Sequence, residues 1–466
     1  MIIGNIYNSS PKVGEGVRWR SMNLFTPCSL LFILCSLLFA QSVSAQYRNT
    51  GSYVTVRMTP DRADWTYSCR DNVHLSLFVE RHNVAIPNVT VSYSWGYEQR
   101  PAILKDSLRI DKSGIATVTL KGADKPGFMT FTATVKVDGE SYTNYINLAF
   151  DPLKIKPTTT LPEDFMTWWQ SELRKAEAVP LQPVFKHEPE MSNGKADVYM
   201  VHFQNHKAGS YIYGMLTVPK TAGKHAAVVE YPGAGIHKFQ SGNMAWADSD
   251  IVCLQIGIHG IPLDMPAEVY QNLTNGGMAN YAYLGLEHRD NYYYRRVYLG
   301  AAKAVDFLKS LDYVDSTRIG VYGGSQGGLL SLVVAALKPE VRCVSAAYPA
   351  MCETAGSRYD RAEGWPRLFV WRKGTDIQQI RDVVPYFDAV NFARFVTQDI
   401  QFFQGYNDHV CMPTTTFSAY NVLPQGHKTL ITPYDCSHWL YPEQHAARIR
   451  WMCRHLKQTQ FSTYKQ

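Results

Sequence analysis

Apolar residues change their spacing once along this chain, and that change constrains the fold more than any other feature. Between Tyr47 and Phe150, apolar and polar residues alternate over short segments separated by turn residues. A period of two with many β-branched residues is typical of antiparallel strands with one buried face. After Pro162, short apolar runs alternate with longer segments of helical spacing. The chain is therefore expected to contain an all-β part followed by an α/β part.

The first part contains six segments with the spacing of strands. They are residues 53–56, 74–79, 89–93, 115–120, 131–135 and 145–148. Their number and length predict a small immunoglobulin-like β-sandwich over residues 46–153. Cys69 is the single cysteine of this part, so the disulfide of true immunoglobulin domains is absent. Trp65, Trp95 and Tyr97 are candidates for stacking on sugar rings, although such residues more often fill a core or a domain interface.

The second part follows a connector rich in Pro and Thr, Lys154–Pro162. Helices are expected over residues 164–178, 292–311, 328–337 and 443–457, and strands over 226–231, 251–254, 318–322 and 400–403. Apolar strands that alternate with helices predict a doubly wound, mainly parallel sheet with helices on both faces. We assign this α/β domain to residues 154–466.

The N-terminus has the layout of a secretory signal peptide. Arg18 and Arg20 precede the apolar run Leu30–Ala40, and the small-residue segment Val43–Ala45 follows it. The run has 11 residues, whereas a membrane-spanning helix needs about 20. The pattern predicts cleavage after Ala45, export to the periplasm or medium, and no stable membrane span in the mature protein.

Composition narrows the range of partners. Apolar residues make up 45% and charged residues 18% of the 466 residues, as in a folded globular protein. The net charge of +6 is spread without a run of like charges, which argues against a nucleic acid partner. The seven cysteines beyond residue 45 have spacings that suit no zinc site, so no metal is expected. An odd number leaves at least one cysteine unpaired, and no disulfide is assigned.

A serine lies in the glycine-rich segment Gly323–Gly328, between an expected strand and an expected helix. This context turns the pattern Gly-x-Ser-x-Gly into a strong indication of a nucleophile elbow, as in α/β-hydrolases. Glycine is expected at positions 323 and 327 because larger side chains would clash in so sharp a turn. Ser325 is therefore the predicted nucleophile. The alternative is a glycine-rich turn that only lets a helix pack closely on a strand.

A serine nucleophile needs a base and an orienting carboxylate, which follow it in α/β-hydrolases in the order Ser, Asp, His. Asp408 follows the expected strand at residues 400–404, and His438 follows the next expected strand at residues 428–431. Both are assigned to these roles. His409 and His427 are weaker candidates for the base, and Asp435 remains an alternative carboxylate.

An oxyanion hole would use the backbone N–H of Gln326 and a second one from the loop after an early strand. The segment Tyr231–Gly235 follows such a strand and contains the glycines that this loop needs. Ala234 is the candidate for the second donor. The alternative is an ordinary turn.

Several stretches resemble the acetyl xylan esterase and cephalosporin C deacetylase family, carbohydrate esterase family seven. They are Leu161–Phe165 with Trp168 and Trp169, Tyr292–Tyr298, Gly324–Gly328, Tyr386–Asn391, Asp408 with Cys411, Pro413 and Phe417–Asn421, and His438. The resemblance covers residues 160–458. It implies Ser325 as nucleophile, Asp408 as orienting acid and His438 as base, in agreement with the spacing. It also implies deacetylation of sugar esters and a ring-like homo-oligomer, which the extra N-terminal domain could block. A serine triad needs no cofactor, so none is expected.

The chain departs from that family at two places. His259–Ile261 stands where the family has Arg-Gly-Gln, and Trp439 follows the predicted catalytic histidine where the family has Glu. Pocket shape and acyl preference are expected to differ accordingly. His259, Asp264 and Trp439 are candidates for the substrate pocket, although a structural loop histidine is the commoner role for His259.

We therefore expect an exported serine esterase that removes acetyl groups from acetylated plant oligo- or polysaccharides. One alternative is a serine hydrolase for a bulkier ester or for a peptide, of the prolyl oligopeptidase kind. The ~105 residues of the first part are too few for a multi-bladed propeller, at about 40–45 residues per blade, which weakens the peptidase interpretation. Another alternative is a carbohydrate-binding protein with an inactive hydrolase domain.

Overall fold

The computed structural model describes residues 52–236, 238–239, 241–369 and 377–457. The predicted signal peptide, residues 1–45, lies outside the described residues. Val54–Gln466 form one compact unit, so the all-β and α/β parts contact each other within it. In the described ranges, no helix has the length and apolarity that crossing a membrane requires.

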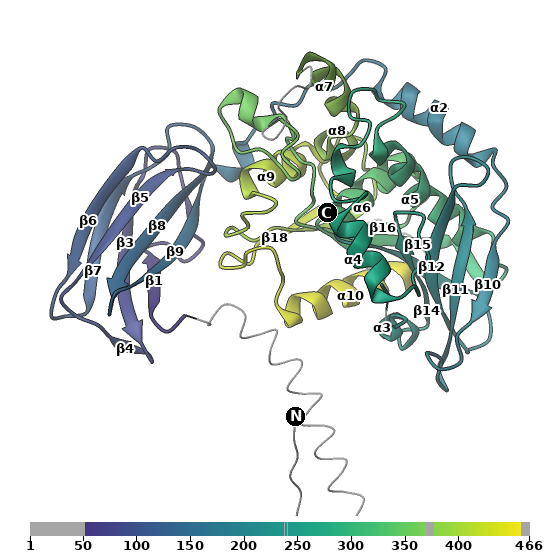
Figure 1. Ribbon diagram of the computed structural model, residues 1–466, viewed down its shortest axis with the longest axis horizontal. Coiled ribbons are helices and arrows are strands. Elements are labelled where there is room, and N and C mark those ends of the chain that lie inside the picture. Colours follow the sequence, from purple (N-terminus) through teal and green to yellow (C-terminus); the bar gives the residue numbers. More distant parts are fainter. Residues whose placement is uncertain (1–51, 237, 240, 370–376, 458–466) are drawn as a thin grey trace, which may run out of the picture. The chain divides into compact units, whose positions relative to one another are not determined.

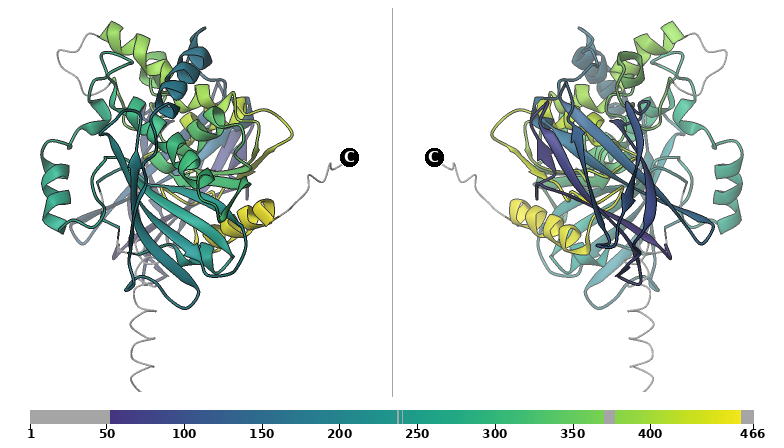
Figure 2. Two further views of the ribbon diagram at one scale, coloured as in Figure 1. Left: turned by 90° about the vertical axis from the view of Figure 1, so that its right-hand side faces the viewer. Right: turned by 90° about the vertical axis from the view of Figure 1, so that its left-hand side faces the viewer.

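Two β-sheets form the first part (Figure 1). One contains β1 (Thr55–Pro60), β3 (Asn72–Arg81), β4 (Val84–Ala85) and β7 (Ile115–Lys121). The other has the order β2 (Thr66–Tyr67), β9 (Glu140–Phe150), β8 (Gly127–Val137), β5 (Val89–Tyr97) and β6 (Leu104–Ile110). All pairs are antiparallel except β2 with β9. The right-hand view of Figure 2 looks onto these purple and blue strands.

Side-chain alternation builds the core of this part. Val73, Leu75, Leu77 and Val79 on β3 are all fully buried, while residues between them are exposed or half-buried. Each of the six predicted strands is present and longer than expected at one end or both. The edge strand β6 escaped prediction because most of its residues are exposed and Asp106 interrupts the apolar residues Leu104, Leu108 and Ile110 on one face. Trp95 is a core residue, since it is buried and its Nε1–H donates to the Lys121 carbonyl at 2.9 Å.

The second part contains a sheet of nine strands. Their order is β10 (Val184–His187), β11 (Ala196–Gln204), β12 (Tyr211–Pro219), β14 (Ile251–Gly257), β13 (His225–Tyr231), β15 (Val314–Gly324), β16 (Cys343–Ala347), β17 (Asp399–Phe403) and β18 (Lys428–Ile431). Strands β13 to β18 pair in parallel, whereas β10, β11 and β12 add an antiparallel edge. The sheet is mainly parallel, as predicted. Strands β10–β12 and β16 were not anticipated.

Helices cover both faces of this sheet. On β13, Ala227 and Val229 belong to the core beneath α5 (Tyr293–Lys309) and α6 (Gln326–Leu337). The alternate residues Ala226 and Val228 pack with α10 (Pro442–Lys457) and with Trp246 of α3 (Met244–Ala247). The remaining helices are α2 (Phe165–Glu177), α4 (Ala267–Asn275), α7 (Ile377–Val383), α8 (Ala389–Ala393) and α9 (Pro413–Val422). Because both faces are buried, the central strands are apolar throughout, which explains why they could be recognised.

The parallel strands end at one edge of the sheet, where functional loops of such folds gather. The loop Pro232–Gly235 follows β13, Ser325 follows β15, Asp408 follows β17 and His438 follows β18. This arrangement brings together residues that are up to about 200 positions apart in the sequence.

Candidate active site

Ser325 occupies the turn between β15 and α6 in a backbone conformation that L-residues rarely adopt, with φ 58° and ψ −121°. The neighbouring glycines make this turn possible. A Cβ on Gly323 would lie 2.5 Å from the carbonyl of Gly327, and a Cβ on Gly327 would lie 2.3 Å from the carbonyl oxygen of Tyr231. The strand–turn–helix geometry predicted from the glycine-rich segment is therefore present.

Asp408 and His438 are joined directly. The Nδ1 atom of His438 lies 2.8 Å from Oδ2 of Asp408. The carboxylate is fully buried, whereas 23% of the imidazole is exposed. The other carboxylate oxygen, Oδ1, accepts the backbone N–H groups of Val410 and Cys411 at 2.8 and 2.9 Å. Three hydrogen bonds thus fix the orientation of both carboxylate oxygens.

The alternative candidates for the base and the carboxylate contact other side chains. His409 lies 2.7 Å from the hydroxyl of Tyr145 and 3.1 Å from that of Ser437. His427 pairs with Asp399 at 3.0 Å, at the opposite end of strand β17. The exposed carboxylate of Asp435 accepts a hydrogen bond from the hydroxyl of Tyr441. Among these candidates, Asp408 is the carboxylate that contacts His438.

The side chain of Gln326 holds the loop after β13 in place. Its Nε2 donates to the carbonyl of Gly233 at 3.1 Å, and its Oε1 accepts the hydroxyls of Tyr281 and Tyr294 at 3.0 and 2.8 Å. The Tyr281 hydroxyl also accepts the backbone N–H of Gly235 at 3.2 Å. The residue whose backbone N–H was predicted to contact an oxyanion therefore also fixes, through its side chain, the loop that contains Ala234. The sequence pattern identified the position but not this second role.

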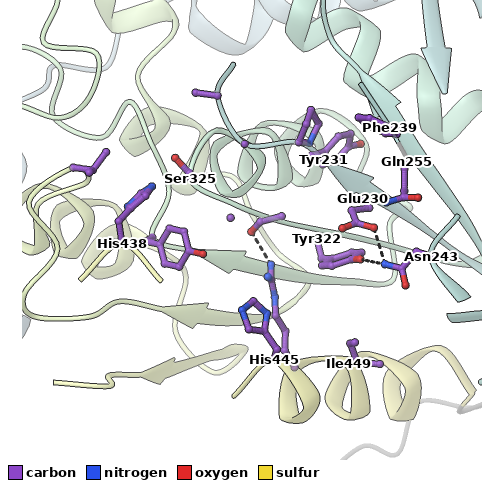
Figure 3. A pocket seen from close by; sticks show the side chains of 18 of the residues that line it. Glu230, Tyr231, Phe239, Asn243, Gln255, Tyr322, Ser325, His438, His445 and Ile449 are labelled. Carbon is purple, nitrogen blue, oxygen red and sulfur yellow. Dashed lines mark hydrogen bonds between the residues drawn. The ribbon is translucent and has the colours of Figure 1, made fainter. Parts of the chain in front are cut away.

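Ser325 and His438 line one cavity of about 760 Å³, together with Ala234 (Figure 3). Its other end is polar, because Glu230, Asn243, Gln255 and Tyr322 lie close together there. Asn243 Nδ2 donates to Glu230 at 2.8 Å and to the Tyr322 hydroxyl at 3.1 Å.

The opposite side of the polar end comes from α10. The buried guanidinium of Arg448 donates to the carbonyls of Gly323 and Ser345, at 2.6 Å each, and so holds the end of β15. Burial, followed by the nearby charge of Arg448, lowers the pKa of His445. His445 therefore remains neutral to lower pH than an ordinary histidine.

The three residues suggested for the substrate pocket do not line this cavity. His259 holds the loop after β13, since its ring nitrogens lie 3.0 Å from the Gly235 carbonyl oxygen and 2.8 Å from the Tyr293 hydroxyl. Asp264 is 47% exposed and lies 3.5 Å from Lys186. Trp439 packs edge-on against Tyr441, with ring centroids 4.7 Å apart. His259 lines a smaller neighbouring cavity that shares Pro232 and Phe239 with this one, so the substrate-pocket assignment of the three residues stays a prediction.

The described residues contain no group of three or more His, Cys, Asp and Glu side chains arranged to hold a metal ion. The seven cysteines from Cys69 to Cys453 are unpaired with one another.

Comparison with known proteins identifies the family. The family model of acetyl xylan esterase (AXE1) matches residues 143–455. The chain is 33% identical over 456 residues to the acetyl esterase Axe7A of Xylanibacter ruminicola, an alignment that covers 97% of this chain and 100% of that relative.

Two solved acetyl xylan esterases share the fold. The enzyme from Paenibacillus sp. R4 is 26% identical, with a TM-score of 0.56, and covers 65% of this chain and 98% of its own. Acetyl xylan esterase 1 from Thermoanaerobacterium sp. JW/SL YS485 is 25% identical, with a TM-score of 0.57, and covers 66% and 98%. The predicted α/β-hydrolase sheet is confirmed, and the chain is a carboxylic-ester hydrolase that belongs to the acetyl xylan esterase family.

Proposed function

We propose that this protein is an exported serine esterase that removes acetyl groups from acetylated plant oligo- or polysaccharides. The observation that carries the proposal is the 2.8 Å contact between Asp408 and His438 at the cavity that Ser325 also lines. Nucleophile, orienting carboxylate and base follow β15, β17 and β18 at the carboxyl edge of the sheet, in the chain order usual for α/β-hydrolases.

Acylation begins with attack of the Ser325 hydroxyl oxygen on the acetyl carbonyl carbon. His438 takes the hydroxyl proton on Nε2, because its Nδ1–H is donated to Asp408, whose carboxylate only accepts. The tetrahedral intermediate then collapses, the bond to the sugar oxygen breaks, and His438 returns the proton to that oxygen. Acetyl-Ser325 remains.

Deacylation repeats these steps with water. His438 removes a proton from the water as it attacks the acyl carbonyl, and it then protonates Ser325 as acetate leaves. Asp408 remains a carboxylate throughout. It maintains the Nδ1–H tautomer of His438 and stabilises the imidazolium that forms in each half-reaction.

The backbone N–H groups of Gln326 and Ala234 are the proposed donors to the oxyanion. Gln326 begins α6, so its amide lies at the positive end of the helix dipole. The hydrogen bond from Gln326 Nε2 to Gly233 supports this assignment, since it ties the two segments together before substrate binds. Preorganised donors stabilise charge without reorganisation during the reaction.

The polar end of the cavity supports a carbohydrate as the alcohol part of the substrate. Glu230 and Gln255 offer acceptors for sugar hydroxyls, and Asn243 and Tyr322 offer further polar groups. Gln255 Oε1 is buried and has no hydrogen-bond partner within the described part of the chain. An acceptor left in this state is suited to a hydroxyl that arrives with the ligand.

We also propose that residues 1–45 are a signal peptide and that residues 46–153 form an immunoglobulin-like sandwich ahead of the esterase domain at residues 154–466. The charged and apolar segments around Arg20 and Leu30–Ala40 support export to the periplasm or medium. The two mostly antiparallel sheets of the first part support the sandwich assignment.

Acetate release from acetylated xylan, mannan and pectin tests the proposal, with cephalosporin C as a non-polysaccharide acetyl ester. We expect Ser325→Ala to reduce release by about 10⁴-fold or more. Unchanged release by that variant would contradict the assignment of the nucleophile. A series of p-nitrophenyl esters with longer acyl chains, beside a prolyl peptide, separates an acetyl esterase from the alternative serine hydrolases.

A further inference from the structure

The N-terminal sandwich holds the two residues that come directly before Asp408 in the sequence. On β9, the backbone N–H of Asn147 donates to the side-chain oxygen of Asn407 at 2.8 Å. The Nδ2 atom of Asn147 donates to the carbonyl of Tyr406, also at 2.8 Å. Asn407 is the residue immediately before Asp408, so these bonds act one residue from the carboxylate that orients His438.

A second side chain of β9 spans both neighbours of Asp408. The Tyr145 hydroxyl lies 2.9 Å from the carbonyl oxygen of Asn407 and 2.7 Å from Nδ1 of His409. A hydroxyl has one hydrogen, so donation to the carbonyl requires that His409 carry a proton on Nδ1. The same nitrogen lies 3.1 Å from the hydroxyl of Ser437, which directly precedes His438 in the sequence. Tyr145 thus connects the sandwich to the acid loop and, through His409, to the loop of the base.

The segment after Asp408 is anchored by the sandwich as well. Glu98 Oε2 accepts the backbone N–H of Thr414 at 3.0 Å, and its other oxygen accepts Asn147 Nδ2 at 3.2 Å. The backbone N–H of Phe128 donates to the Thr414 hydroxyl at 3.1 Å. Thr414 is the second residue of α9, where the backbone N–H has no acceptor inside the helix. The side-chain oxygen Oε2 of Glu98 supplies that acceptor.

The centre of this polar network is buried. Asn147 and Glu98 are each 3% exposed, and the remaining amide oxygen of Asn147 accepts the Thr130 hydroxyl at 2.7 Å. An apolar cluster already joins the two parts, formed by Phe128, Ala149, Ile155, Tyr406 and Phe417. Apolar contacts tolerate small shifts, whereas a satisfied hydrogen-bond network specifies one arrangement. Asn147 and Tyr145 contact the residues on either side of Asp408.

We propose that Asn147 and Tyr145 of the sandwich are positioning residues for Asp408, so that the N-terminal domain completes the active site of the esterase domain. The inference rests on the proposed role of Asp408 in catalysis. It assigns the sandwich a part in the reaction that differs from binding polysaccharide.

The expected effect is on turnover. Misplacement of a catalytic group by about 1 Å costs on the order of 10²-fold in rate. We therefore expect Asn147→Ala to reduce kcat by about 10- to 100-fold and Tyr145→Phe by about 3- to 10-fold. KM should change less than about 3-fold, because neither residue lines the cavity beside Ser325.

A double-mutant cycle on the full chain separates positioning from general destabilisation. Asn147→Ala and Tyr145→Phe are each measured in the native sequence and in the Asp408→Ala background, with p-nitrophenyl acetate as substrate. If the two residues act through Asp408, they reduce kcat only while Asp408 is present. Thr143→Val is the matched control. It removes a 2.8 Å hydrogen bond to Thr134 between β8 and β9, and it is expected to keep native kcat.

Each outcome decides one point. Equal losses in both backgrounds, or an equal loss in Thr143→Val, would overturn the positioning role. Native kcat in folded Asn147→Ala and Tyr145→Phe, with an inactive Asp408→Ala, would also overturn it and leave the proposed function intact. Native activity of Asp408→Ala would instead refute the proposed function. Thermal unfolding of each variant establishes that it is folded at the assay temperature, and Tyr145→Phe, which is nearly isosteric, carries the test if Asn147→Ala does not fold.

Discussion

Replacing Asp408 by asparagine is expected to invert the tautomer of His438 while it leaves the shape of the site intact. In the native site, Oδ1 accepts two backbone N–H groups, from Val410 and Cys411, and Oδ2 faces Nδ1 of His438. An asparagine NH₂ group cannot replace Oδ1, because it would face two donors. The NH₂ group must therefore point at His438 and donate to Nδ1. The imidazole proton then lies on Nε2, which can no longer accept the proton of Ser325.

The size of the loss in kcat can be estimated from the hydrogen bonds around Asp408. Two backbone hydrogen bonds at about 1 kcal/mol each favour this orientation by about 2 kcal/mol, so more than about 95% of molecules adopt it. Donor–donor repulsion increases that share. The neutral amide also removes the charge that stabilises the imidazolium. The equivalent change in the trypsin triad lowers kcat by about 10⁴-fold, and the same loss here corresponds to about 5.5 kcal/mol in activation free energy.

The assay is hydrolysis of p-nitrophenyl acetate and of an acetylated xylo-oligosaccharide, with kcat and KM measured for both. Asp435→Asn is the matched control, because this exposed carboxylate contacts Tyr441, and near-native kcat is expected. Guanidinium unfolding shows whether Asp408→Asn retains the native fold. A folded Asp408→Asn protein with kcat within 10-fold of native would refute the reasoning, and a large loss in Asp435→Asn would transfer the role to that residue.

Three further predictions concern pH, specificity and stability. Burial raises the pKa of Glu98 to about 8, so the folded protein keeps a proton that the unfolded chain loses near pH 4.5. The free energy of unfolding should therefore fall by about 5 kcal/mol as the pH rises between these two values. Glu98→Gln should flatten this pH dependence in denaturant titrations. Gln255→Leu removes an acceptor from the polar end of the cavity. It should raise KM for an acetylated oligosaccharide about 10-fold and leave KM for p-nitrophenyl acetate unchanged. Equal effects on the two substrates would contradict a sugar-binding role. Trp169→Ala empties a fully buried position and removes a 2.8 Å hydrogen bond to the Tyr386 carbonyl. The free energy of unfolding in guanidinium should therefore fall by about 3–5 kcal/mol. A decrease of less than about 1 kcal/mol would be inconsistent with this packing.

Local patterns were sufficient to predict the elements that position the candidate site. The glycines around Ser325 indicated a sharp strand–helix turn because no larger side chain fits at positions 323 and 327. Asp408 and His438 could be located because each follows an apolar strand, and parallel strands end at a common edge. Their catalytic roles remain predictions that the variants above test.

Strands without a clear period were harder to recognise. On the edge strand β6, Asp106 interrupts the apolar residues of one face, and β10 is exposed along its whole length, so neither has the regular alternation that identifies a strand. The direction of single side chains was equally hard to predict. Asp264 lies near Lys186 and Trp439 packs against Tyr441, and both partners depend on tertiary packing.

The sequence by itself predicted the two-part architecture, the strand–turn–helix at Ser325 and the positions of Asp408 and His438 after apolar strands, because periodicity and glycine sterics act over a few neighbouring residues. Only the tertiary structure decided what surrounds them. The contact of Asn147 with Asn407 joins residues 260 positions apart, and the polar end of the cavity combines Glu230, Gln255 and Arg448 from three elements. Such contacts leave no periodic trace in the chain, since each depends on how whole sheets and helices pack against one another.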